Sequence, residues 1–162
     1  MIDINNESGV EVEEEGLVAL ARFALAQLRI HPQAELSIML VDEETMASYH
    51  ERFMDLPGPT DVLSFPMDEL RAPLDDEDPP LGLLGDIVLC PQVTARQAAD
   101  NGRKPDAEAE YLLIHGLLHL LGHDHADERM RQREFRQRPV LVTSSGQFGI
   151  QAVGAADQQC DI

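Results

Sequence analysis

The residues best suited to chemistry lie in one short stretch, HGLLHLLGHDH, at residues 115–125. His115 and His119 are four positions apart, so on a helix both imidazoles project from the same face. Gly122 can adopt a positive φ and end the helix, and the reversed chain would then bring His125 to the same point. Three imidazoles and one open position are typical of a catalytic zinc site. The spacing predicts one Zn²⁺ per chain, with metal-bound water as the reactive group.

Nitrogen ligands favour zinc over magnesium or calcium and leave iron, nickel and copper as alternatives. A lone histidine on an apolar helix is usually structural, but an i, i+4 pair followed by a glycine turn and a third histidine favours a metal site. His123 and Asp124 lie between the predicted ligands, and Asp124 could orient one of them through its second ring nitrogen. His31 and His50 stand outside the pattern and are predicted to be surface residues.

The histidine and glycine spacing also matches the metzincin motif H-E-x-x-H-x-x-G-x-x-H. Gly116 occupies the position of the glutamate that serves those proteases as general base. A metalloprotease lacking that base is therefore one alternative, and a phosphodiester substrate fits the residues better. A glycine inside a helix costs about 1 kcal/mol relative to alanine, so Gly116 is predicted to have a packing or access role.

The composition limits the class of protein. The 162 residues suit a single domain, and 30 acidic against 12 basic residues give a formal charge of −18. Such a charge repels polyanions and argues against a general nucleic-acid coat. The acidic start is not a secretory signal, and no apolar run reaches the length of a membrane span, so a cytoplasmic protein without a membrane partner is expected. The two cysteines do not form a disulfide framework.

Hydrophobic periodicity predicts strands interleaved with helices and hence an α+β fold. We expect a small mixed, mostly parallel sheet of about four strands flanked by helices, with the histidine motif on the last helix and the turn after it. Residues 68–80, rich in acids and prolines, should form a solvated excursion. Residues 1–138 are predicted to be a single metal-dependent hydrolase domain, and 139–162 a disordered or divergent tail. The predicted strands are 1–6, 35–41, 60–65 and 86–89, and the predicted helices 13–29, 42–53, 91–101 and 106–121.

The histidine motif resembles the H-G-x-L-H-L-x-G-Y-D-H signature of the YbeY family, bacterial single-strand-specific endoribonucleases and rRNA maturation factors. The stretches GPTDVLSFP at 58–66 and LGDIVLC at 84–90 are also similar to that family. The amino-acid sequence there is most similar to that of actinobacterial members. The resemblance spans about residues 1–128. It implies that His115, His119 and His125 bind zinc and that the protein cleaves single-stranded RNA during maturation of the 16S rRNA 3′ end and ribosome quality control.

The resemblance also implies the small ribosomal subunit and its proteins as partners, for which the acidic charge would suit docking on basic ribosomal proteins. Three features depart from the family pattern. His123 stands where the family has Tyr. Met54 stands where many members carry an Arg, and we do not assign the role of that Arg to the nearby Arg52. The segment 127–138 has five arginines and few apolar residues. A non-catalytic, zinc-stabilised assembly factor is the remaining alternative.

Overall fold

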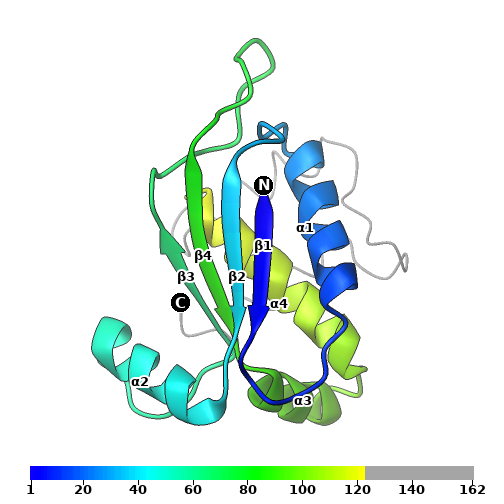
Figure 1. Cartoon of the computed structure of the whole chain (residues 1–162), viewed down its shortest axis with the longest axis vertical. Coiled ribbons are helices and arrows are strands. Elements are labelled where there is room, and N and C mark those ends of the chain that lie inside the picture. Colours follow the sequence, from blue (N-terminus) through cyan, green and yellow to red (C-terminus); the bar gives the residue numbers. More distant parts are fainter. Residues whose placement is uncertain (123–162) are drawn as a thin grey trace.

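The computed structural model describes residues 1–122, which form four strands and four helices (Figure 1). The α+β class and each element predicted from periodicity are confirmed, with ends shifted by at most three residues. The elements are β1 (Ile2–Asn6), α1 (Glu14–Gln27), β2 (Glu35–Leu40), α2 (Glu43–Met54), β3 (Val62–Pro66), β4 (Leu83–Leu89), α3 (Pro91–Asp100) and α4 (Pro105–Leu120).

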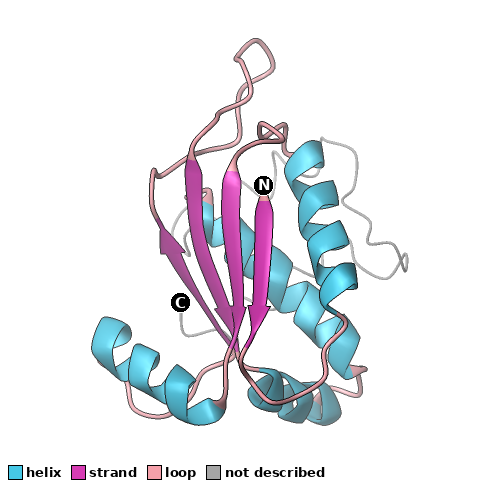
Figure 2. Ribbon diagram, viewed as in Figure 1, coloured by secondary structure: helices cyan, strands magenta, loops and turns pink. Residues whose placement is uncertain are grey.

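The four strands form one sheet in the order β1-β2-β4-β3 (Figure 2). β1 pairs with β2 and β2 with β4 in parallel, whereas β3 pairs with β4 in the antiparallel direction. The mixed, mostly parallel sheet is therefore as expected. β3 is an edge strand, although it follows β2 and α2 in the chain, because β4 inserts between β2 and β3.

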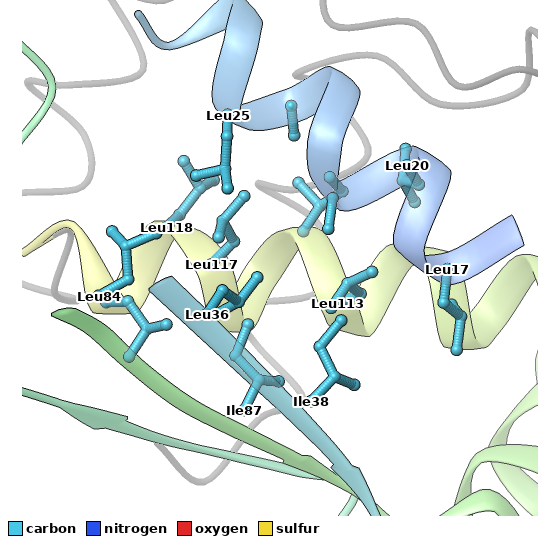
Figure 3. Packing of buried hydrophobic residues seen from close by; sticks show 14 of the residues in the cluster. Leu17, Leu20, Leu25, Leu36, Ile38, Leu84, Ile87, Leu113, Leu117 and Leu118 are labelled. Carbon is cyan, nitrogen blue, oxygen red and sulfur yellow. The ribbon is translucent and has the colours of Figure 1, made fainter. Parts of the chain in front are cut away.

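One face of the sheet is covered by α1 and α4, which pack on each other and on the strands (Figure 3). α4 is apolar around most of its circumference, as expected of a helix that is buried on several sides. The largest apolar cluster lies in this layer. Its members include Leu17, Leu20, Leu25, Leu36, Ile38, Leu84, Ile87, Leu113, Leu117 and Leu118.

A second, smaller apolar cluster lies on the opposite face of the sheet, between the strands and the helices α2 and α3. Buried side chains there are Val41, Met46, Leu63, Val88, Cys90 and Val93. The alternation of side chains along a strand explains the division, since Val62 points into the first cluster and Leu63 into the second. Each face of the sheet thus carries an apolar cluster, the larger one beneath α1 and α4.

Local signals in the sequence account for several helix starts. The Asp42 carboxylate accepts a hydrogen bond of 2.8 Å from the main-chain N–H of Thr45, as an N-cap should, and this bond lowers the pKa of Asp42. Pro91 and Pro105 stand at the first positions of α3 and α4, where a missing N–H costs no helical bond. α2 ends at Asp55, which adopts a left-handed conformation before the Pro-Gly-Pro segment.

The acidic excursion after β3 is mostly exposed, as predicted, and Arg29 helps to fasten it to the domain. Arg29 donates hydrogen bonds of 3.1 Å and 3.2 Å to the carbonyls of Leu74 and Glu77. Arg71 also forms an ion pair with Glu77 at 2.9 Å. Within residues 1–122, no helix is long and apolar enough to cross a membrane.

The edge strand β3 has few main-chain donors available for a further strand. In an antiparallel pair, every second residue bonds the partner strand and the residues between them direct their main-chain groups outward. Asp61 and Met67 bond β4, through the Cys90 N–H and the Leu84 carbonyl. Val62, Ser64 and Pro66 therefore direct their main-chain groups away from β4. The Asp61 carboxylate already accepts the Val62 N–H at 2.8 Å, and Pro66 has no N–H. These features oppose unwanted strand pairing at this edge.

Gly85 begins the regular part of β4 with a φ of +133°, and a Cβ built there would lie 2.1 Å from the Phe65 carbonyl oxygen. We expect Gly85→Ala to lower the free energy of unfolding by at least about 3 kcal/mol, because it combines backbone strain of about 1–3 kcal/mol with a main-chain clash. Gly58→Ala is the control, since Gly58 has a φ of +81° and open space around it.

The control should lose only about 1–2 kcal/mol, the cost of a left-handed residue. Urea unfolding followed by circular dichroism measures both variants. Equal midpoints for the two variants would contradict the clash at Gly85.

Candidate functional site

The last two turns of α4 bring His115 and His119 together. Their Nε2 atoms lie 2.9 Å apart, and the ring centroids are separated by 4.4 Å with the planes inclined at 70°. His115 is buried and His119 is partly exposed. The i, i+4 spacing has therefore placed the two imidazoles as predicted, with one of them reaching toward solvent.

The chemistry of this donor pair fits a metal ion. Two nitrogen ligands at about 2.0–2.1 Å from a tetrahedral zinc would be about 3.3–3.4 Å apart, so small side-chain rotations would separate the Nε2 atoms enough. The distance of 2.9 Å is also that of an N–H···N hydrogen bond between neutral imidazoles. In either case, the two Nε2 atoms converge on one point, which is the property that the motif predicted.

The third predicted ligand, His125, lies outside the described residues, as do His123, Asp124 and the arginines of 129–138. Gly122 does adopt the predicted positive φ, at 87°. Among residues 1–122, no three His, Cys, Asp or Glu side chains gather to hold a metal ion. The structure therefore places two of the three predicted ligands, and the full set of three stays a prediction.

Gly116, between the two histidines, lies against the sheet. A Cβ built on it would be 3.0 Å from Ser64 Oγ, 3.1 Å from Ile87 Cγ2 and 3.2 Å from Val62 Cγ2. These separations are shorter than ordinary van der Waals contacts, so a side chain at residue 116 would require its neighbours to shift by a few tenths of an ångström. The predicted packing role of Gly116 is confirmed.

Ser64 links the family-like stretch at 58–66 to this region, and Asp61 orders the start of β3. The Ser64 hydroxyl donates a hydrogen bond of 2.9 Å to the Gly116 carbonyl, so it bonds the helix α4 across the sheet face. Asp61 is buried, and its carboxylate accepts hydrogen bonds from Val62 N–H and the Thr60 hydroxyl at 2.8 Å and 3.2 Å. The sequence did contain a signal for this contact: Ser64 is a small polar residue in an apolar strand, and Gly116 is a glycine in an apolar helix.

The prediction that His50 is a surface residue is wrong. His50 is 2% exposed, and its Nδ1 lies 2.8 Å from the Gly58 carbonyl. It follows Met46 by four residues, so both side chains occupy the buried face of α2. His50 thereby connects α2 to the Pro-Gly-Pro segment before β3. His31 is partly exposed, and its Nδ1 accepts the Gln33 N–H at 3.1 Å.

Cys90 is buried at the end of β4, as expected of a small packing residue. Burial raises the pKa of its thiol, which lowers its reactivity as a nucleophile or ligand. Its main-chain N–H donates to the Asp61 carbonyl at 3.1 Å. Cys90 therefore helps to align the start of β3 with the end of β4.

Comparison with known proteins adds the family to this geometry. The family model described as Endoribonuclease YbeY matches residues 2–144 of the chain. The chain belongs to the YbeY endoribonuclease family. As a member of that family it is a nuclease, a hydrolase that acts on RNA. The match extends beyond residue 128, the limit of the resemblance seen in the motifs.

Relatives within the YbeY family are similar over most of their length. The Endoribonuclease YbeY of Cutibacterium acnes is 73% identical over 144 residues, which cover 89% of this chain and 93% of the relative. That of Streptomyces griseus is 50% identical over 159 residues, or 96% of each chain. The solution structure of TM1509 from Thermotoga maritima has a TM-score of 0.52 at 20% identity and covers 99% of this chain and 97% of that one, which supports the fold alone.

The close contact at Gly116 predicts opposite effects for two glycine-to-alanine changes in helices. Gly116→Ala should lower the free energy of unfolding by about 1–2 kcal/mol, because overpacking of about 1–3 kcal/mol outweighs the gain in helix propensity. Gly16→Ala in α1 should stabilise the protein by up to about 1 kcal/mol, since the nearest atom to its added Cβ belongs to the flexible Glu13 side chain.

Thermal and urea unfolding of the two variants, compared with the parent protein, test this pair. A stabilised Gly116→Ala variant would show that α4 is free to move away from β3.

Proposed function

We propose that this YbeY family member is a zinc-dependent, single-strand-specific endoribonuclease of the cytoplasm that acts in maturation of the 16S rRNA 3′ end and in ribosome quality control. His115, His119 and His125 would hold one Zn²⁺ per chain. The observation that carries the proposal is the convergence of the His115 and His119 Nε2 atoms, 2.9 Å apart, in a chain of an endoribonuclease family.

When bound, zinc would polarise a phosphoryl oxygen and lower the pKa of a coordinated water toward about 7. The chain's own contribution is to place the ligands. α4 holds His115 inside the domain and leaves His119 partly exposed. We infer that RNA would approach the pair from the His119 side. Gly116 and Ser64 hold this part of α4 against the sheet.

The charge of −18 calls for an explanation in an enzyme that acts on RNA. Long-range repulsion weakens association with free RNA, whereas contacts at the cleavage site are governed by the local potential. An acidic surface is also complementary to the basic proteins of a ribosomal subunit. We propose that the protein reaches its RNA by docking on proteins of the small subunit.

Loss of one ligand should abolish RNA cleavage while the fold persists. We expect His119→Ala to reduce cleavage of single-stranded RNA at least about 100-fold, because even groups that support a metal ligand contribute about 10–100-fold. Removal of metal by a chelator should reduce the RNA cleavage activity of the parent enzyme by a similar factor, and added Zn²⁺ should restore that activity. Gel-resolved cleavage of an end-labelled RNA, together with metal analysis, provides the measurement.

His31→Ala is the matched control, since it removes an imidazole outside the pair, and it should keep full activity. A metal-free preparation with full RNase activity would refute the zinc mechanism. Stoichiometric zinc without RNA cleavage would favour the non-catalytic assembly factor instead. A peptide-cleavage assay of the same zinc-loaded protein tests the metalloprotease alternative.

Docking on ribosomal proteins predicts a particular competition. When the protein is bound to purified small subunits, excess small-subunit proteins should displace it, and the same mass of free single-stranded RNA should leave it bound. Co-sedimentation through a sucrose cushion measures the bound fraction. Displacement by free RNA alone would contradict the proposed route to the substrate.

A further inference from the structure

The hydrogen bond between Ser64 and Gly116 joins the edge strand β3 to the helix that carries the histidine pair. Ser64 Oγ donates to the Gly116 carbonyl at 2.9 Å across 52 positions of sequence. Gly116 directly follows His115 and precedes His119 by three residues. A carbonyl oxygen has two lone pairs, so it can accept this bond in addition to its bond within the helix. The strand therefore holds α4 in the turn that contains both imidazoles.

The contact depends on the absence of a side chain at residue 116. A Cβ there would lie 3.0 Å from Ser64 Oγ, in the space that now lets the hydroxyl reach the main chain. Val62 and Ile87 pack against the same position, with Cγ2 atoms 3.2 Å and 3.1 Å from such a Cβ. Apolar contacts of this kind tolerate small sliding and rotation of a helix, because they have little directional preference.

The Ser64 bond differs from these contacts because a hydrogen bond is directional. It fixes both the position of α4 along its axis and its rotation, since the Gly116 carbonyl must stay within reach of the hydroxyl. A rotation of α4 would move both imidazoles together with that carbonyl. The placement of the two Nε2 atoms is thereby linked to a side chain on another element of the fold.

We propose that Ser64 is a positioning residue for the candidate metal site: its hydrogen bond to Gly116 sets where the His115 and His119 Nε2 atoms converge. This inference rests on the proposed zinc function and extends it to a residue outside the histidine motif. Ser64 acts through α4 and contacts no metal or substrate in this scheme.

The test compares three variants of the full chain. Ser64→Ala removes the hydroxyl, Ser64→Thr retains it, and Val62→Ala removes an apolar contact with the same helix position. The dissociation constant for Zn²⁺ is measured by competition with a chromophoric chelator, and thermal unfolding of the metal-free proteins reports stability. We expect Ser64→Ala to weaken zinc binding about tenfold, as loss of groups that support metal ligands does.

The variants should separate positioning from stability. Ser64→Thr is expected to stay within about twofold of the parent affinity, the rescue that a retained hydroxyl gives. Val62→Ala should lower the unfolding temperature more than Ser64→Ala does and still bind zinc within about threefold of the parent, since the directional bond remains. If both alanine variants lose affinity in proportion to their loss of stability, Ser64 has only a structural role and the proposal fails.

A second readout does not depend on zinc binding. In the metal-free protein, NMR of the imidazole nitrogens of His115 and His119 reports their contact at 2.9 Å. We expect these signals to shift in Ser64→Ala and to return toward the parent values in Ser64→Thr. Unchanged signals in Ser64→Ala would overturn the inference. If the parent protein binds no zinc, the proposed function fails, while the NMR comparison still decides whether Ser64 positions the pair.

Discussion

The close approach of α4 to the sheet is the constraint on which the site depends. α4 is apolar on nearly all sides and packs on α1, α3, β3 and β4, so its burial drives much of the folding of the domain. At Gly116 the helix comes as near to the strands as a residue without a side chain allows. Because His115 and His119 flank this point of contact, the same packing that stabilises the fold also determines where two candidate ligands lie. The helix propensity lost at Gly116 is the local cost of that arrangement.

The sequence predicted the local structure well, since its signals are local. Asp42, Pro91 and Pro105 begin helices for reasons visible in a few residues, and the spacing of His115 and His119 predicted their shared face. The order of the strands could not be predicted from local signals, because packing of distant segments inserts β4 between β2 and β3. His50 was missed because the histidine pattern gave no reason to bury it, although it shares the buried face of α2 with Met46 and lies against the Gly58 carbonyl. The partner of Ser64 was also out of reach of local signals, because the Gly116 carbonyl lies 52 residues later in the chain.

The β3 strand has two sides with different roles. Val62 and Ser64 face α4 at Gly116, whereas Leu63 and Phe65 face α2. Along its free edge, Asp61 occupies the Val62 N–H and Pro66 offers none, so the strand is protected from pairing with other chains although it lies at the edge of the sheet. The family-like stretch at 58–66 therefore serves as edge protection and helix anchor at once, and neither role requires its residues to take part in chemistry.

The packing at Gly116 also bears on the choice between nuclease and protease chemistry. In the metzincin pattern, the residue after the first histidine is the glutamate that acts as general base. In this structure that residue faces the sheet, with Ser64, Ile87 and Val62 atoms within 3.2 Å of the position that its Cβ would take. A side chain there would require these neighbours or α4 to shift by a few tenths of an ångström, and the hydroxyl nearest to it is the one that bonds the Gly116 carbonyl. The packing that holds this part of α4 against the sheet therefore favours glycine at the position where the metzincin pattern has its base.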